Sequence, residues 1–343
     1  MRKVLIRIGI AIAILGMVGV FFFKGSILPS VTTVADDEYF HIYKAGNLDN
    51  VADSLIKYGF IKSKKDLIST AGLMRFKDSD LVPGRFKLKK GWNNIQLLDF
   101  LARGKQSPVK LVINPMRKTE NVATFLGKNL ESDSLDFITL MQDTTFLDSL
   151  GVDVQNAMTL FIPNTYEVYW TSTPKSFLKK MKKESDKFWE KDNREEKLKS
   201  LGMTRQQVYT LASIVDKETQ QNIEKATIAG LYLNRIAQDM PLQADPTVVF
   251  AGNDLTIKRV TNRHIATVSP YNTYINKGLP PGPIGMASAS SIDAVLNHEK
   301  HNYLYMCARP DTSGRHNFAE TFAAHVAFAN IYRDWLTKQG LGL

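Results

Sequence analysis

Apolar and polar residues alternate with different periods along the chain, and the longest apolar stretch comes first. Arg2, Lys3 and Arg7 precede an uncharged run over Ile8–Phe23, which Lys24 ends. Together with the apolar residues before Arg7, the stretch reaches the roughly 20 residues that a helix needs to cross a bilayer. Basic residues before such a span keep the N-terminus in the cytoplasm. The pattern therefore predicts a cytoplasmic tip and a transmembrane anchor over residues 1–24.

A cleaved signal peptide is the alternative interpretation of this segment. Signal peptides end in small residues at a cleavage site, whereas this run ends in three phenylalanines followed by Lys24. That ending favours a retained anchor. We therefore expect a single-pass protein of the cytoplasmic (inner) membrane, with the body of the chain on the periplasmic or outer side.

The next part of the chain predicts a linker and a small mixed module. Residues 25–37 contain Pro, Ser and Thr without helical periodicity, which is typical of a linker. Residues 38–106 then switch between strand and helix periodicity. The predicted elements are a strand over Glu38–Tyr43, helices over Leu48–Tyr58, Lys65–Leu73 and Trp92–Leu101, and a turn into a strand over Val82–Leu88. A small module of this kind suits binding or positioning better than catalysis.

A larger unit is expected over residues 107–343. It begins with a predicted strand, Val109–Ile113, and continues with helical patterns over Thr119–Leu130 and Ser134–Leu140. A run of alternating charges over Lys175–Lys199 predicts one long helix with a solvated face. These predicted strands and helices indicate an α+β fold. It is made of a transmembrane helix, a small module and a larger mixed domain.

The charge of the chain favours an anionic partner and the motifs narrow the choice. The 343 residues carry a formal net charge of +10, which attracts polyanions such as nucleic acid, anionic lipid or cell wall. No zinc-finger spacing or RNP-like aromatic motif is present, so we expect no nucleic-acid binding. Walker and dinucleotide-binding glycine patterns are also missing, and His316 and His325 stand apart from other ligand types. We therefore expect no cofactor and no metal.

One cysteine, Cys307, is present, so no intrachain disulfide can form. It lies in an apolar run, where a buried structural thiol is the expected use.

A helix with an unusually placed acid is predicted after Thr204. Thr204 and Gln207 have the spacing of a capping box. Leu211, Ile214 and Val215 then form an apolar stripe, and Glu218 is the next position on the same face. Asp216 and Lys217 fall away from that stripe. A carboxylate on a buried face either pairs with a cation, reaches solvent, or keeps its proton near neutral pH, and only the last outcome makes a general acid.

Five ordered blocks from this helix onward resemble the endolytic murein transglycosylase family of bacteria, also called the YceG-like family. The blocks are Leu211–Thr219, Leu231–Arg235, Leu242–Val248, Ser269–Tyr274 and Gly278–Ile284. The resemblance implies that the small module is LysM-like and that residues 107–343 form a YceG-like catalytic domain. It also implies that Glu218 is the catalytic residue. The family has a Glu where this chain has Asp216, which argues against an essential role for that position.

The family resemblance implies a lytic transglycosylase. Such an enzyme cuts the bond between N-acetylmuramic acid and N-acetylglucosamine inside nascent peptidoglycan strands, without water, and leaves 1,6-anhydro ends. The implied partners are the glycan strands, the cytoplasmic membrane and peptidoglycan synthases. A hydrolytic muramidase using Glu218 and Asp245 and a non-catalytic wall-binding scaffold are the alternatives.

Several residues of the matched blocks are candidates for substrate binding. The loops carry amide, carboxyl and tyrosyl groups that suit a sugar cleft, but each has an ordinary structural use as well. Asp245 before a proline also suits a cap, and the aromatic residues also suit loop packing. Gln243 could bind an acetamido group or orient Glu218. The candidates are Gln243, Asp245, Tyr271, Asn272 and Tyr274.

Overall fold

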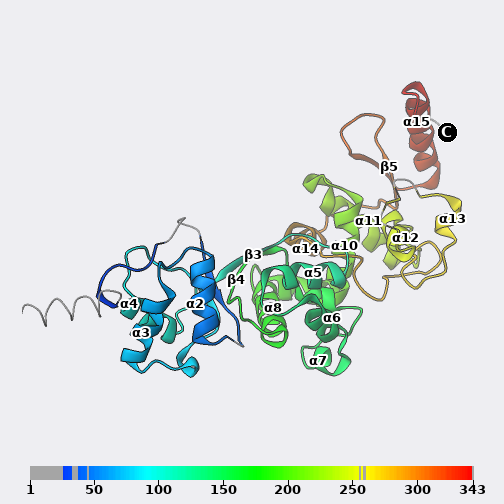
Figure 1. The fold of residues 1–343 in the computed structure, drawn as a ribbon. Coiled ribbons are helices and arrows are strands. Elements are labelled where there is room, and N and C mark those ends of the chain that lie inside the picture. Colours follow the sequence, from blue (N-terminus) through cyan, green and yellow to red (C-terminus); the bar gives the residue numbers. More distant parts are fainter. Residues whose placement is uncertain (1–25, 33–37, 45, 255, 258–259, 342–343) are drawn as a thin grey trace, which may run out of the picture. The chain divides into compact units, whose positions relative to one another are not determined.

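The computed structural model describes residues 26–32, 38–44, 46–254, 256–257 and 260–341. These residues form two compact units with mixed α+β structure. Unit 1 contains the chain up to Leu111 together with Asn129–Glu131 and Glu167–Ser172, and unit 2 contains the remainder. In Figure 1, unit 1 is coloured mainly blue to cyan, and unit 2 runs from green to red.

Unit 1 is a short sheet covered by helices. Its elements in order are β1 (Phe40–Ile42), α2 (Leu48–Lys57), α3 (Lys64–Met74), the 3-10 turn η1 (Asp78–Asp80), β2 (Gly84–Phe86) and α4 (Asn94–Ala102). β1 and β2 pair antiparallel, with Phe40 opposite Phe86. Both rings are buried in one apolar core with Leu55 and Leu97. Side-chain caps begin the helices, as where Asn47 accepts the amide N–H of Asn50.

Residues 26–32 correct the predicted linker, because they are part of unit 1. The side chain of Val31 is buried in the core of the unit. Its backbone pairs with Ile61 as an isolated antiparallel bridge, and its amide N–H donates to the carbonyl of Trp92. This segment therefore lacks periodicity and still packs on the core of unit 1.

Unit 2 consists mainly of helices, with short strands at three places. Two strands, β3 (Val109–Ile113) and β4 (Asn164–Val168), belong partly to unit 1 and partly to unit 2. The first part of unit 2 also contains α5 (Thr119–Asn129), α6 (Ser134–Gln142), α7 (Thr144–Asp148), η2 (Ala157–Leu160), α8 (Pro174–Trp189) and α9 (Arg194–Leu201). Its second part contains α10 (Arg205–Glu218), η3 (Asn222–Glu224), α11 (Lys225–Ala237), α12 (Asp245–Ala251), α13 (Asn262–Ile265), α14 (Ala289–Leu296), β5 (Tyr305–Ala308), β6 (His316–Ala319) and α15 (Phe322–Lys338). β3 pairs with β4, and β5 pairs with β6.

The predicted long helix over Lys175–Lys199 is wrong, since two helices replace it. α8 ends at Trp189 and α9 begins at Arg194. Between them Asp192 and Asn193 both have φ of 56°, a left-handed conformation that Asn and Asp tolerate better than most residues. The break could not be predicted from the charges, because charged residues continue through the segment between the two helices.

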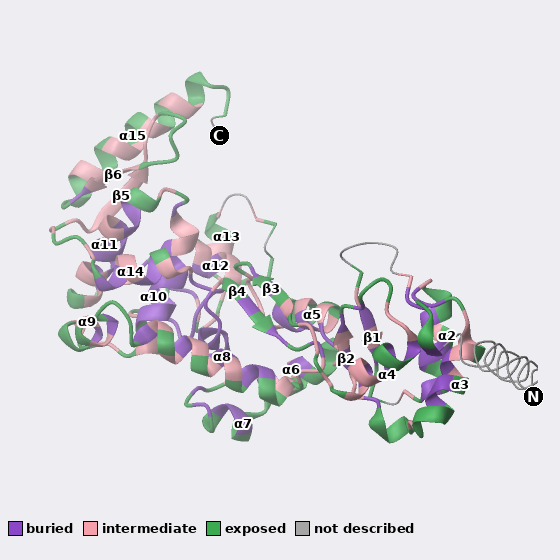
Figure 2. Ribbon diagram, turned by 90° about the vertical axis from the view of Figure 1, so that its left-hand side faces the viewer, coloured by how far each residue is buried: buried purple, intermediate pink, exposed green. Residues whose placement is uncertain are grey.

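α10 lies at the centre of unit 2 and is buried on nearly all sides. The predicted capping box begins it, since Thr204 Oγ1 accepts the amide N–H of Gln207 while the Gln207 side chain accepts the amide N–H of Thr204. Every residue from Val208 to Val215 is buried. α11, α12 and α14 all pack against it, and Figure 2 shows it in the colour of buried residues. Its first and last turns reach the surface.

β5, β6 and α15 form a hairpin and a helix at the end of unit 2. The register places Tyr305 opposite Ala319 and Ala308 opposite His316. α15 packs on both strands, yet none of its residues is buried, and Figure 2 shows it as exposed and half-buried residues. This substructure therefore offers side chains to its surroundings on several faces.

The structure corrects the predicted location in the cytoplasmic membrane. None of the helices in the described ranges is long and apolar enough to cross a bilayer. α15 has 17 residues, for example, but it includes the charged residues Arg333, Asp334 and Lys338. The segment on which the prediction depended, residues 1–24, lies outside the described residues. The other predicted domain boundaries stay predictions.

Candidate active site

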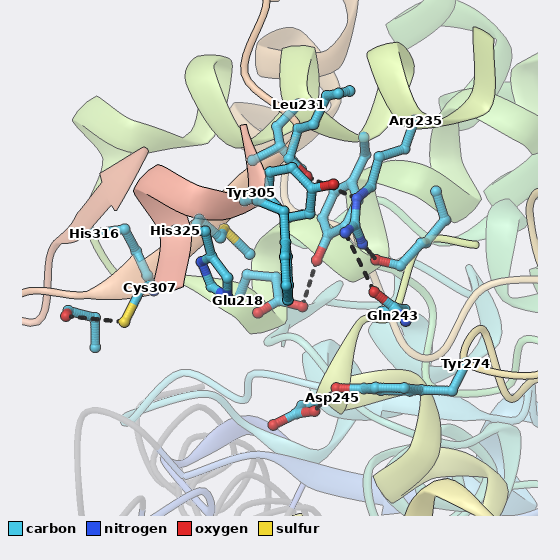
Figure 3. A pocket seen from close by; sticks show the side chains of 16 residues that line it. Glu218, Leu231, Arg235, Gln243, Asp245, Tyr274, Tyr305, Cys307, His316 and His325 are labelled. Atoms are coloured by element: carbon cyan, nitrogen blue, oxygen red, sulfur yellow. Dashed lines mark hydrogen bonds between the residues drawn. The ribbon is translucent and has the colours of Figure 1, made fainter. Parts of the chain in front are cut away.

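A pocket of about 360 Å³ lies where the last turn of α10 reaches the surface of unit 2. Glu218 comes from α10, Tyr232 and Arg235 come from α11, and Gln243 and Asp245 come from the segment that leads into α12. β5 and α15 supply further wall residues. Figure 3 shows Arg235, Gln243 and Asp245 near the carboxyl group of Glu218. The pocket therefore combines residues that lie far apart in the sequence.

Glu218 has the environment of a carboxylic acid that keeps its proton. Burial raises its pKa to about 7, and the negative charge of Asp245 acts in the same direction. The hydroxyl of Tyr232 opposes both effects, because it donates a hydrogen bond of 2.7 Å to Glu218 Oε1. The balance leaves the group able to give and to accept a proton near neutral pH, which is what a general acid–base catalyst needs.

Tyr232 was not among the residues predicted from the sequence. Its side chain is buried in the core of unit 2 on α11, and only its hydroxyl meets a polar partner in the site. A tyrosine on an apolar helix face is normally interpreted as a core residue. The sequence feature that could have pointed to Tyr232 as a site residue was its place in the Leu231–Arg235 block.

Asp216 is partly buried, so the expectation that it lies away from the core holds only in part. Its Oδ1 accepts hydrogen bonds of 2.6 Å from both Ser288 and Ser291. Burial alone would raise the pKa of Asp216, but these hydroxyls and the charges of Lys217 and Lys225 hold it below the ordinary value. Two acids of one helix thus have pKa values pushed in opposite directions, a difference that separates a structural anion from an acid–base group.

Arg235 fixes the loop that carries Gln243. Its guanidinium is buried and donates to the backbone carbonyls of Leu304, Pro241 and Leu242 and to the side-chain oxygen of Gln243. Gln243 itself is exposed in the pocket with φ of 52°. The side-chain NH₂ group of Gln243 has no hydrogen-bond partner within the described residues and can meet a ligand, while Arg235 orients the side-chain oxygen. Arg235 is a second site residue that the sequence reasoning did not single out.

Asp245 and Tyr274 form a pair at the edge of the pocket. The Tyr274 hydroxyl donates to Asp245 Oδ1 over 2.5 Å. Burial first, and then this bond and the nearby carboxylates, raise the pKa of Tyr274, so the hydroxyl keeps its proton. Ala244 is the N-cap residue of α12, and Asp245 follows it as the first residue of the helix. Asp245 is therefore not the N-cap of this helix, and its side chain lines the pocket (Figure 3).

The remaining two candidates lie elsewhere. Asn272 is fully buried, and its amide donates to the carbonyls of Ile265 and Thr267. It shapes the loop from inside and does not line the pocket. Tyr271 packs on Phe250 with ring centroids 4.9 Å apart and lines a different pocket of unit 2.

β5 and α15 give the pocket a wall with aromatic faces. The ring of Tyr305 stacks on His325 at 5.5 Å, with Phe322 beside both. Burial and the charge of Arg235 lower the pKa of His325, so its ring is neutral near pH 7. Flat, partly exposed rings of this kind suit the apolar face of a sugar.

Cys307 lies in the same wall and is only half-buried. This corrects the expected fully buried thiol. Within the described residues, no group of three or more His, Cys, Asp and Glu side chains could hold a metal ion.

The pKa of Glu218 gives a prediction about stability. A carboxyl group whose pKa rises from 4.5 to about 7 on folding stabilises the fold below pH 4.5, and this contribution is lost as the pH rises through 7. Glu218→Gln is neutral at every pH and can still accept the Tyr232 hydrogen bond. We expect the variant to be more stable than the wild type by roughly 2–3 kcal/mol at pH 8. Denaturant unfolding should show this difference shrinking toward zero near pH 4. Equal differences at both pH values would contradict it.

Known proteins with similar sequences and structures were compared with the chain. The sequence profile of the YceG-like family matches residues 40–330. A Bacillus subtilis (strain 168) protein named endolytic murein transglycosylase is 26% identical over 329 residues, which cover 90% of this chain and 88% of that protein. A Streptococcus pneumoniae (strain D39) protein of the same name is 28% identical over 298 residues, or 78% of this chain. The chain spans only about half of that longer protein, 53%.

The solved structures include a similar one. A crystal structure of a YceG-like protein from Listeria monocytogenes aligns with a TM-score of 0.55 and 26% sequence identity, covering 84% of this chain and 98% of that chain.

Proposed function

The chain belongs to the YceG-like family, and from this premise we propose that it is an endolytic lytic transglycosylase that cleaves peptidoglycan strands. The observation that carries the proposal is the carboxyl group of Glu218, which lies in a pocket and has a pKa near 7. The names of the relatives in Bacillus and Streptococcus support the same activity. The substrate would be the bond between N-acetylmuramic acid and N-acetylglucosamine inside a nascent strand.

Glu218 would perform both proton transfers of the reaction. It first gives its proton to the oxygen that leaves C1 of the muramic acid, while the substrate's acetamido group stabilises the developing positive charge. The glycosidic C–O bond breaks in this step. The C6 hydroxyl of the same sugar then attacks C1 and returns its proton to Glu218. The product is a 1,6-anhydro end, and the enzyme finishes with the protonation state in which it began.

The neighbouring residues would bind and orient the sugars. The side-chain NH₂ group of Gln243 points to an acetamido oxygen as its partner, because Arg235 already occupies the Gln243 oxygen. Tyr305 offers a ring face to a sugar. Asp245, held by Tyr274, would accept hydrogen bonds from sugar hydroxyls and keep the pKa of Glu218 raised.

A hydrolytic muramidase would need Asp245 as nucleophile or base. In this chain the Asp245 carboxylate already accepts a hydrogen bond from Tyr274, which lowers its nucleophilicity. The names of the relatives also disfavour hydrolysis and a purely binding role.

We also propose that unit 1 is the LysM-like module. Its strand, two helices and second strand in succession support this, and so does the family profile, which begins at residue 40. Peptidoglycan synthases as partners stay a prediction.

Removing the hydrogen bond from Tyr232 tests how this bond sets the pKa of Glu218. Because the bond favours the carboxylate form, Tyr232→Phe should raise the pKa of Glu218 further. The alkaline limb of the profile of kcat/KM against pH should then move up by about one pH unit, with a modest loss of kcat. Phe keeps the buried ring, so a purely structural role for Tyr232 predicts an unchanged limb. A limb that stays in place, or moves to lower pH, would overturn this assignment.

The test of the function is an analysis of products. Purified, uncrosslinked glycan strands are incubated with the full chain, and chain length and end groups are determined by mass spectrometry. The proposal expects early loss of long strands and new ends of the anhydro type. Release of short pieces from strand ends alone would argue against internal cleavage. Ends that borohydride can reduce would favour the muramidase.

A further inference from the structure

A second pocket, of about 630 Å³, shares Glu218 and Asp245 with the first. Both carboxyl groups therefore stand where the two pockets meet. A strand cut in its interior must extend to both sides of the scissile bond, and these two pockets offer room on both sides. The walls of the second pocket include two cationic side chains, Arg117 and Lys217.

The backbone beside Arg117 is fixed by its contacts to residues 285 and 286. It lies in the connection between β3 and α5, where the carbonyl of the preceding residue, Met116, accepts the amide N–H of Met286 over 2.8 Å. Gly285 approaches the same backbone closely, since a Cβ there would lie 3.3 Å from the Met116 carbonyl oxygen. Gly285 and Met286, directly after the Gly278–Ile284 block, thus hold the backbone beside Arg117.

The guanidinium of Arg117 is partly buried and forms no hydrogen bond or ion pair within the described residues. Its Nη1 atom is buried and makes no hydrogen bond to any part of the chain that the structure describes. A buried cationic donor without an acceptor is costly. Lys217 differs, because it is paired with Asp216 at 3.4 Å. Lys118, beside Arg117 in the chain, donates to Asn253.

The carboxylates near Arg117 do not act as acceptors for its guanidinium. Glu218, Asp245 and Glu120 line the pockets to which Arg117 contributes, but none forms an ion pair with it among the described residues. A ligand that brings its own carboxylate would satisfy Arg117 with a charge-assisted, directional pair of hydrogen bonds.

We propose that Arg117 recognises a carboxylate carried by the bound glycan strand next to the scissile bond. The inference rests on the proposed function and adds a substrate class to it, namely strands with free acidic groups. Two sources share this chemistry. One is the lactyl carboxylate of muramic acid that has lost its peptide, and the other is a carboxylate of an attached peptide.

The test compares acidic with neutralised strands. Wild type, Arg117→Met, Arg117→Lys and the control Lys118→Met are assayed on peptide-free strands, on peptide-bearing strands, and on each form after its carboxylates are converted to amides. We expect Arg117→Met to lower kcat/KM by about 10- to 100-fold on acidic strands, mainly through KM, with no loss on amidated ones. Arg117→Lys should lose less, and Lys118→Met should change little. The acidic form that shows the loss identifies the source.

Two outcomes would overturn the inference. One is an equal loss on acidic and amidated strands, which would assign Arg117 to the fold, and the other is no loss on either form. Binding to the Glu218→Gln chain, which should not cut strands, separates this inference from the proposed function. Tighter binding of acidic than of amidated strands that disappears in the Glu218→Gln, Arg117→Met double variant supports carboxylate recognition, even if cleavage is never observed.

Discussion

Glu218→Gln is expected to reduce the turnover of glycan strands by about 100- to 10,000-fold, the range that general acid–base catalysis contributes. Gln fills the same volume and can keep the Tyr232 hydrogen bond. It cannot give a proton to the leaving oxygen or accept one from the C6 hydroxyl, so both steps are affected. Initial rates of strand cleavage at pH 7 give the measurement.

The control for this variant is Glu196→Gln, which changes an exposed acid on α9. It should cleave strands at the wild-type rate. Because Glu218→Gln is also expected to be the more stable protein at this pH, a loss of activity cannot be ascribed to unfolding. Wild-type rates from Glu218→Gln would require another acid and would remove the basis of the proposed mechanism.

Arg235→Met is expected to lower the free energy of unfolding by roughly 3–5 kcal/mol, as for other buried charged networks that lose one member. The guanidinium satisfies the carbonyls of Leu304, Pro241 and Leu242. Met fills much of the volume but leaves these acceptors without donors, and each unsatisfied group costs about 1–3 kcal/mol. The measurement is denaturant unfolding of the full chain.

Arg263→Met, which changes an exposed arginine of α13, is the matched control and should cost less than about 0.5 kcal/mol. If both variants unfold at the same denaturant concentration, Arg235 does not hold the loop of Gln243 in the way described. Any residual activity of Arg235→Met should show a raised KM, since Gln243 loses its orientation.

Local sequence patterns predicted helices and strands correctly where the apolar residues follow a single helical or strand periodicity. The helix after Thr204 followed from a capping box and an apolar stripe, and both features are present in α10. The strand Val109–Ile113 was also correct to the residue. The predictions were wrong at the break between α8 and α9 and over residues 26–32. In these places backbone conformation and tertiary pairing, which periodicity does not encode, decide the structure.

The position of Glu218 was found by an argument that holds only in part. The stripe of Leu211, Ile214 and Val215 is buried, but so are the other faces of α10. Asp216 is partly buried, with hydrogen bonds that keep it ionised. What distinguishes Glu218 is therefore that it forms no ion pair among the described residues and that it lines a pocket. Neither can be seen from one helix.

The rest of the site could not be predicted because it is assembled across the chain. Tyr232 reaches Glu218 from the next helix, and Tyr305 and His325 come from β5 and α15. Arg117 is about a hundred positions away from Glu218 in sequence yet lines a pocket with it. In the sequence each of these residues has an ordinary structural explanation. A role in the site becomes evident only when the fold places them together.

The most direct test of the account is the source of the oxygen at the new strand end. Cleavage is run in water enriched in heavy oxygen, quenched early with borohydride, and analysed by mass spectrometry. The account predicts anhydro ends that contain no heavy oxygen and resist reduction, because the C6 hydroxyl takes the place of water. Heavy oxygen at reducible muramic acid ends, formed at the rate of strand cleavage, would contradict it.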